Sequence, residues 1–125
     1  MPLAGIGQMK GSNCNSIKKG KFYFYPSNSQ KQFLIIRNYS IQKEINLQTN
    51  DTSFWKVSWQ SPCMFTLTFL QRSQPISSEE LLFFNSHKTV VKVLKITKDY
   101  YIFKGGLDAI TNSSAVADTL WLKRK

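Results

Sequence analysis

The sequence predicts a mainly all-β fold, an up-and-down antiparallel meander of about eight strands that forms a barrel or half-barrel with one short helix. Apolar and polar residues alternate with a period of two through most of the chain, and clusters of Gly, Pro, Asn, Asp and Ser separate the alternating segments. A length of 125 residues, 42% of them hydrophobic, suffices for one core. No apolar run approaches the roughly 18 residues of a membrane-spanning helix, so we expect no transmembrane segment.

Aromatic residues occupy alternate positions in three of the predicted strands. In the first strand, 21–25, two phenylalanines face one way and two tyrosines the other, and we expect the phenylalanine face to form the core. The fourth strand, which follows a turn at 49–52, and the fifth strand, 64–72, repeat this pattern on either side of a turn at 61–63. The side chains predicted to share the inner face are Phe22, Phe24, Trp55, Trp59, Phe65, Leu67 and Phe69.

A tight hairpin is predicted between the second and third strands, 32–37 and 40–47. Asn38-Tyr39 connects them, and Asn tolerates the positive φ that such turns require. In the third strand, 40–47, apolar residues alternate with Ser, Gln, Glu and Asn. This alternation predicts one dry face, made of Ile41, Ile45 and Leu47.

After Pro75 the pattern changes from strand to helix. Ser77 and Glu80 have the spacing of a capping box, and the apolar quartet 81–84 follows them. We expect one short helix here, lying over an open end or an edge of the sheet with the quartet as its anchor.

The rest of the chain returns to strand character. Strands are expected at 89–97 and 100–104, and a last strand at 118–124 is expected to pair back with the first and help to close the sheet. The small and polar stretch 105–117 is expected to be a mobile loop.

The chain is expected to divide into a flexible N-terminal lead-in, 1–19, and a single β-barrel-like domain, 20–125. The N-terminus lacks the basic start and apolar stretch of a secretory signal, so we expect no export tag. Cys14 in the lead-in and Cys63 in a turn are too few for a Cys₄ metal site. They form a disulfide or remain two buried free thiols, and the residues alone leave both alternatives open.

A net charge of +10 and a pI near 9.8 favour acidic partners such as nucleic acid or anionic lipid. The charges, Arg37 among them, are scattered singly apart from Lys18-Lys19 and 123–125. Scattered basic residues on strands are first interpreted as surface charges that aid solubility and protect sheet edges.

Residues that carry catalytic chemistry are scarce. His87 is the only histidine, no phosphate-binding loop is present, and Glu79-Glu80 fits helix capping better than acid–base catalysis. We therefore predict no enzyme activity, no metal site and no cofactor.

Two binding hypotheses remain. Small up-and-down barrels are either filled with side chains or leave a pocket, so the aromatic face either encloses a small apolar or amphipathic ligand in a lipocalin-like cavity or fills the barrel. We predict a non-enzymatic protein that binds such a ligand or a protein partner at its rim. The alternative is a basic module with a fully packed core that binds protein or, less favoured, nucleic acid, with stacking candidates Tyr23, Tyr25, Tyr39, Tyr100 and Tyr101.

At Gly20-Lys21-Phe22-Tyr23, at 35–42 (IIRNYSIQ) and at 59–67 (WQSPCMFTL), the sequence resembles a family of small uncharacterised proteins of Bacteroidetes-type bacteria, over roughly positions 14 to 104. The resemblance implies a location in the cell envelope or periplasm, because relatives often look exported or lipid-anchored. Cys14 departs from that pattern, since no lipobox precedes it. Some relatives are named as topoisomerase IV, but 125 residues leave no room for the cleavage and dimer domains of such a subunit.

Overall fold

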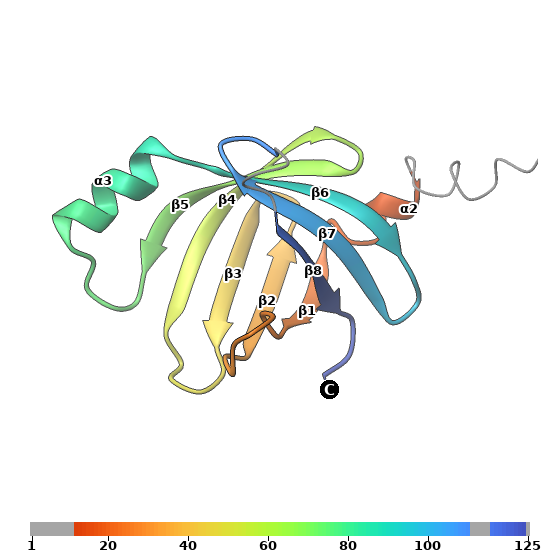
Figure 1. The fold of residues 1–125 in the computed structure, drawn as a ribbon, viewed down its shortest axis with the longest axis horizontal. Coiled ribbons are helices and arrows are strands. Elements are labelled where there is room, and N and C mark those ends of the chain that lie inside the picture. The colour runs from red at the N-terminus through yellow and green to blue at the C-terminus, as the bar shows by residue number, and fades with distance from the viewer. Residues whose placement is uncertain (1–11, 111–115, 125) are drawn as a thin grey trace, which may run out of the picture.

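Eight antiparallel strands form a closed barrel in a computed structural model of the protein, which describes residues 12–110 and 116–124 (Figure 1). Each strand pairs with its neighbours in the sequence, and the last strand pairs with the first. This confirms the predicted up-and-down meander with a helix after the fifth strand. The elements are α2 (Ser12–Asn15), β1 (Gly20–Phe24), β2 (Phe33–Asn38), β3 (Ile41–Asn46), β4 (Thr52–Ser61), β5 (Met64–Arg72), α3 (Ser78–Ser86), β6 (Thr89–Ile96), β7 (Tyr100–Leu107) and β8 (Val116–Trp121).

The strands pair to different extents around the barrel. β1 and β8 close it through only two residue pairs, Tyr23 with Trp121 and Phe24 with Leu120. β5 pairs with β6 only from Met64 to Leu67, although β5 continues to Arg72 along β4. The second half of β5 therefore lacks β6 as a neighbour, and α3 is inserted in the chain at this place.

The core lies inside the barrel, where side chains from alternate strand positions meet. Four of the seven predicted inner-face residues are buried, namely Phe22, Phe65, Leu67 and Phe69. The other three are half-buried and pack against the core, namely Phe24, Trp55 and Trp59. Period-two alternation places aromatic side chains inward because successive residues of a strand point to opposite faces.

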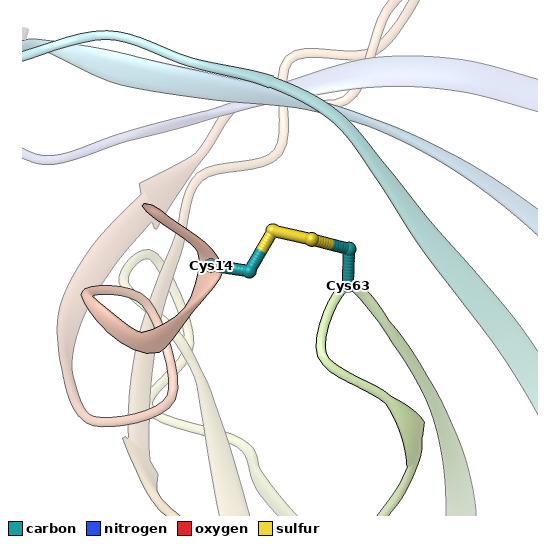
Figure 2. Close-up of a disulfide and its surroundings, with 2 residues drawn as sticks. All are labelled: Cys14 and Cys63. Atoms are coloured by element: carbon teal, nitrogen blue, oxygen red, sulfur yellow. A yellow bond between two sulfur atoms is a disulfide. The ribbon is translucent and has the colours of Figure 1, made fainter. Parts of the chain in front are cut away.

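The N-terminal segment contributes to the core, which corrects the expected flexible lead-in for the described residues from 12 onwards. Cys14 and Ile17 are 0% and 1% exposed, and α2 precedes β1. Cys14 is joined to Cys63 in a disulfide with a Cα–Cα distance of 5.4 Å, which decides between the two alternatives for the cysteines. Figure 2 shows how this bond ties the α2 segment to the hairpin between β4 and β5. The rest of the predicted lead-in, 1–11, lies outside the described residues.

The expected dry face of β3 is wrong. Gln42 is the buried residue of this strand, at 3% exposure, whereas Ile41 and Ile45 are half-buried. The hairpin pairs Gln42 with Arg37 and Ile45 with Leu34, and paired residues project to the same face of a sheet. Gln42 and Glu44 of β3 therefore point into the barrel, and its isoleucines point outward.

Helix α3 forms where it was expected, but most of its apolar quartet does not anchor it. Ser77 and Glu80 make the predicted capping box. Leu82 and Phe83 are 68% and 46% exposed, and Leu81 is exposed as well. Phe84 alone of the quartet is half-buried, stacking on Phe69 with ring centroids 4.7 Å apart. Figure 1 shows α3 standing out from the side of the barrel.

The predicted loop 105–117 is shorter than expected. Strand β7 continues to Leu107 and β8 begins at Val116, and 111–115 lie outside the described residues. Gly106 permits a close approach of the chain here, because a Cβ would clash with the backbone oxygen of Ala109. No helix in the described part of the chain has the length and apolarity needed to cross a membrane.

Candidate functional site in the barrel interior

A buried arginine occupies the interior of the barrel next to the N-terminal segment. Arg37, on β2, is 2% exposed, which corrects its assignment as a scattered surface charge. Its guanidinium donates three hydrogen bonds, from Nε to Gln42 Oε1 at 2.8 Å, from Nη1 to the carbonyl oxygen of Ile17 at 2.8 Å and from Nη2 to the Tyr101 hydroxyl at 2.9 Å. The guanidinium also lies 4.9 Å from the ring centroid of Phe22 and 4.8 Å from that of Phe65.

These contacts explain how a charge can be buried here. Hydrogen-bond acceptors and aromatic ring faces replace the water that Arg37 loses on folding. Tyr101, one of these partners, is 0% exposed, and its burial raises its pKa even though Arg37 opposes the shift. The tyrosine therefore remains a neutral hydroxyl that both accepts from Arg37 and packs edge-on against Phe22, at 5.6 Å between centroids.

A hydrogen-bonded polar row continues from Arg37 along β3. Gln42 accepts from Arg37 through Oε1 and donates from Nε2 to Glu44 Oε2 at 2.9 Å. Glu44 keeps part of its surface accessible, but the barrel surrounds most of the side chain, and this burial raises its pKa against the opposing effects of Gln42 and Arg37. The row thus runs from a buried cation to a poorly solvated carboxyl group.

An apolar cavity of about 150 Å³ lies inside the barrel, beside this row. Three polar residues, Gln42, Thr89 and Tyr101, are among those that line it, and the rest are aliphatic, aromatic or glycine. Arg37 is not part of the wall. The residues that line the cavity are Phe24, Ile35, Gln42, Phe65, Leu67, Thr89, Val91, Tyr101, Phe103, Gly105 and Leu120.

A second space, which we call the rim cleft, has a volume of about 260 Å³ and reaches Glu44. It is lined by the ends of β2 to β5 and their connections, namely Lys31, Phe33, Glu44, Asn46, Asp51, Thr52, Ser53 and Arg72. Phe33 of the cleft and Phe24 of the cavity face each other with ring centroids 6.3 Å apart. The cavity and the cleft are therefore neighbours, because the Phe24–Phe33 contact and the Gln42–Glu44 hydrogen bond each join a residue of one to a residue of the other.

The predicted site residues divide between the cavity and its surroundings. Phe24, Phe65 and Leu67 line the cavity. Phe22 packs instead on Arg37 and Tyr101. Trp55 and Phe69 pack on Phe84 of α3, and Trp59 packs on Phe65 with Lys18 Nζ 5.0 Å from its ring centroid.

The polar members of the site were not recognised in the sequence, although a signal for them was present. Arg37 lies two positions after Ile35 on the same strand, so alternation already places both on one face. Gln42 follows across a hairpin with a two-residue connection, whose pairing determines which residues share that face. Their polar side chains, considered without the strand pairing, predict that Arg37 and Gln42 lie on the outer face of the sheet.

His87, the only histidine of the sequence, is partly exposed and joins two segments at the base of α3. Its Nδ1 lies 2.6 Å from Asp108 Oδ2, and its ring lies 4.7 Å from that of Phe83 between centroids. The hydrogen bond from His87 is the main reason that the pKa of Asp108 lies below its usual range. This pair lies at the surface and reaches neither the cavity nor the rim cleft.

Comparison with known proteins adds no family to this description, since no protein-family model matches the chain and no curated protein is significantly similar to it. The resemblance to a Bacteroidetes family stays a prediction.

Proposed function

We propose that the protein is a non-enzymatic binding protein that holds a small amphipathic ligand inside its barrel. The apolar part of the ligand occupies the cavity, and its polar part reaches the rim cleft. The observation that supports this is the pair Gln42 and Glu44, which brings polar groups to the boundary between an apolar cavity and an accessible cleft. Apolar pockets with a few convergent polar groups are typical of small-molecule sites.

The volumes favour a small ligand over a lipid chain. An apolar cavity of about 150 Å³ in another protein accommodates a molecule of benzene's size. Pockets for drug-sized ligands measure roughly 300–1,000 Å³, a range that neither the cavity nor the rim cleft reaches by itself. Phe24 of the cavity and Phe33 of the rim cleft meet at the boundary of the two spaces, with ring centroids 6.3 Å apart.

The disulfide supports a location outside the reducing cytosol. Disulfides form and persist in the periplasm, at cell surfaces and in secreted proteins. We therefore extend the proposal to the cell envelope or periplasm, in line with the family resemblance, and the pairing of Cys14 with Cys63 is its support.

The alternative, a basic module that binds protein or nucleic acid through its surface, has less support. The cavity is at odds with the fully packed core that this alternative included. Of the stacking candidates, Tyr101 is buried in the core and Tyr39 is 60% exposed, while Tyr23, Tyr25 and Tyr100 are half-buried. If single-stranded DNA does not bind even at low ionic strength, the charge of +10 is only a surface property.

A plugged cavity tests the proposed function. Gly105 lines the cavity, and a Cβ at this position would meet nothing closer than 3.7 Å. Gly105→Val therefore adds a β-branched side chain to a strand with little strain. As a control, Lys104→Val adds the same side chain one position earlier, on the other face of β7.

The measurement is a titration with benzene, followed by ¹H–¹⁵N NMR, together with native mass spectrometry of the purified protein. We expect benzene to shift the amides of cavity residues in the wild type and in Lys104→Val, and to shift none in Gly105→Val. A co-purified small molecule that is lost in Gly105→Val would support the proposal further. If benzene leaves all three spectra unchanged, or shifts them equally, the cavity is not a binding site.

A further inference from the structure

We propose that the ligand is an organic cation, an amphipathic amine whose ammonium group pairs with Glu44 while its hydrocarbon part lies in the cavity. This inference rests on the proposed binding function and specifies the chemical class of its ligand. It follows from the charged residues around the two spaces, because Glu44 lines the rim cleft whereas Arg37 lines neither space.

Arg37 cannot serve as the partner of an anionic ligand. Its guanidinium is 2% exposed and donates to three protein oxygens. Two aromatic rings, those of Phe22 and Phe65, cover it at less than 5 Å. Because Arg37 does not line the cavity, a carboxylate or phosphate in the cavity would meet only neutral polar groups.

Glu44 has the opposite properties. One of its carboxylate oxygens, Oε2, accepts from Gln42, and within the described residues the other oxygen, Oε1, accepts no hydrogen bond from the protein. Glu44 is one of the residues that line the rim cleft, so a ligand in the cleft lies against its side chain. Burial raises the pKa of Glu44, and a bound ammonium group would replace the solvation that the carboxylate lacks.

The other charges of the rim cleft do not cancel this preference. Arg72 donates to the carbonyl oxygen of Pro75 at 2.6 Å and is paired with Glu80 at 3.3 Å. Lys31 is exposed to solvent, and Asp51 adds a second acidic group to the cleft. The net charge of +10 repels a cation over longer distances, but salt at physiological strength screens such repulsion beyond about 8 Å.

Three probes of matched shape test the inference, namely 2-phenylethylamine, which is an ammonium ion at pH 7, the neutral 2-phenylethanol and the anion 3-phenylpropanoate. Each carries one benzene ring for the cavity and a short arm that ends in a different head group. Isothermal titration calorimetry on the wild-type protein should give at least a tenfold lower Kd for the amine than for the alcohol, and the weakest binding for the carboxylate.

Two variants locate the preference. Glu44→Gln keeps an oxygen that can accept from Gln42 but removes the charge, so the amine and the alcohol should then bind within about twofold of each other. Glu79→Gln removes an exposed acid on α3 and should leave the preference unchanged. Circular dichroism spectra of both variants would show that the barrel is intact.

The possible outcomes separate the inference from the proposed function. If the alcohol or the carboxylate binds as tightly as the amine, or if Glu44→Gln keeps the preference, the site binds ligands but not through Glu44, and the inference fails alone. If Gly105→Val still binds the amine as the wild type does, the amine binds outside the cavity and the inference fails. If none of the three probes binds the wild type, the proposed function fails together with it.

Discussion

Replacing Arg37 by methionine should destabilise the protein strongly. The substitution keeps an unbranched apolar side chain but removes the guanidinium, and it leaves Gln42 Oε1, the carbonyl oxygen of Ile17 and the Tyr101 hydroxyl without their donor. A buried acceptor that loses its donor costs about 1–3 kcal/mol. The relief of a buried charge and rotation of Gln42 offset part of this cost, so we expect the free energy of unfolding to fall by about 3–5 kcal/mol.

Urea unfolding, monitored by tryptophan fluorescence, measures this change. Lys56→Met serves as the control, because Lys56 is exposed on β4 and a surface substitution usually changes stability by about 0.5 kcal/mol or less. Arg37→Lys should lie between the wild type and Arg37→Met, since it keeps the charge but loses the planar fork that reaches three acceptors. A loss below about 1 kcal/mol in Arg37→Met would show that water or other donors satisfy these groups, and would refute the reasoning.

Further predictions concern three other features of the fold. Because burial raises the pKa of Glu44, the folded state binds its proton more tightly, so Glu44→Gln should raise Tm at pH 7 and change it little at about pH 4, below the unfolded value of 4.5. The pKa of Asp108 is lowered, so its contribution is present above the unfolded value of 3.8 and is lost as pH falls through the folded value, and Asp108→Asn should lower Tm at pH 7 more than at about pH 3. Replacing Cys14 and Cys63 together by alanine should reduce the free energy of unfolding by about 2–4 kcal/mol in urea, because the disulfide closes a sequence separation of 49 residues, whereas wild-type stability that does not change on full reduction would contradict this.

Much of the fold could be predicted from the sequence because period-two alternation is a local property. Three strands place their apolar residues inward as alternation predicts, namely those that contain Phe22 and Phe24, Trp55, and Phe65. The capping box at Ser77 was predictable for the same reason, since both of its partners lie within four residues. The contact of Ile17 with Arg37 was not, because it joins segments 20 residues apart through one carbonyl oxygen.

The error on β3 has a more specific cause. The prediction places Asn38-Tyr39 in the turn, whereas the structure pairs Asn38 with Ile41, so the turn lies one residue later in the chain. Each residue of β3 therefore pairs with a residue two positions away from its predicted partner. A change of two leaves every side chain on the same face. The predicted hairpin therefore also pairs Gln42 with Ile35 and places both inside the barrel. This pairing conflicts with the inward orientation that the hydrophobicity of Ile41 and Ile45 predicts.

The polar residues that β3 turns into the barrel bear on the function of the protein. Local hydrophobicity and strand pairing agree over most of the barrel, and they disagree where Gln42 and Glu44 enter it. A sequence under selection for stability alone would place an apolar residue at position 44, because a poorly solvated carboxylate without a cation of its own is costly. Arg37 and Gln42 are hydrogen-bonded to each other, but Glu44 stands at the end of the row and lines the rim cleft. A gain in stability together with a loss of amine binding in Glu44→Gln would show that this carboxylate is kept for its ligand, whereas a loss of stability would make it a structural partner of Gln42.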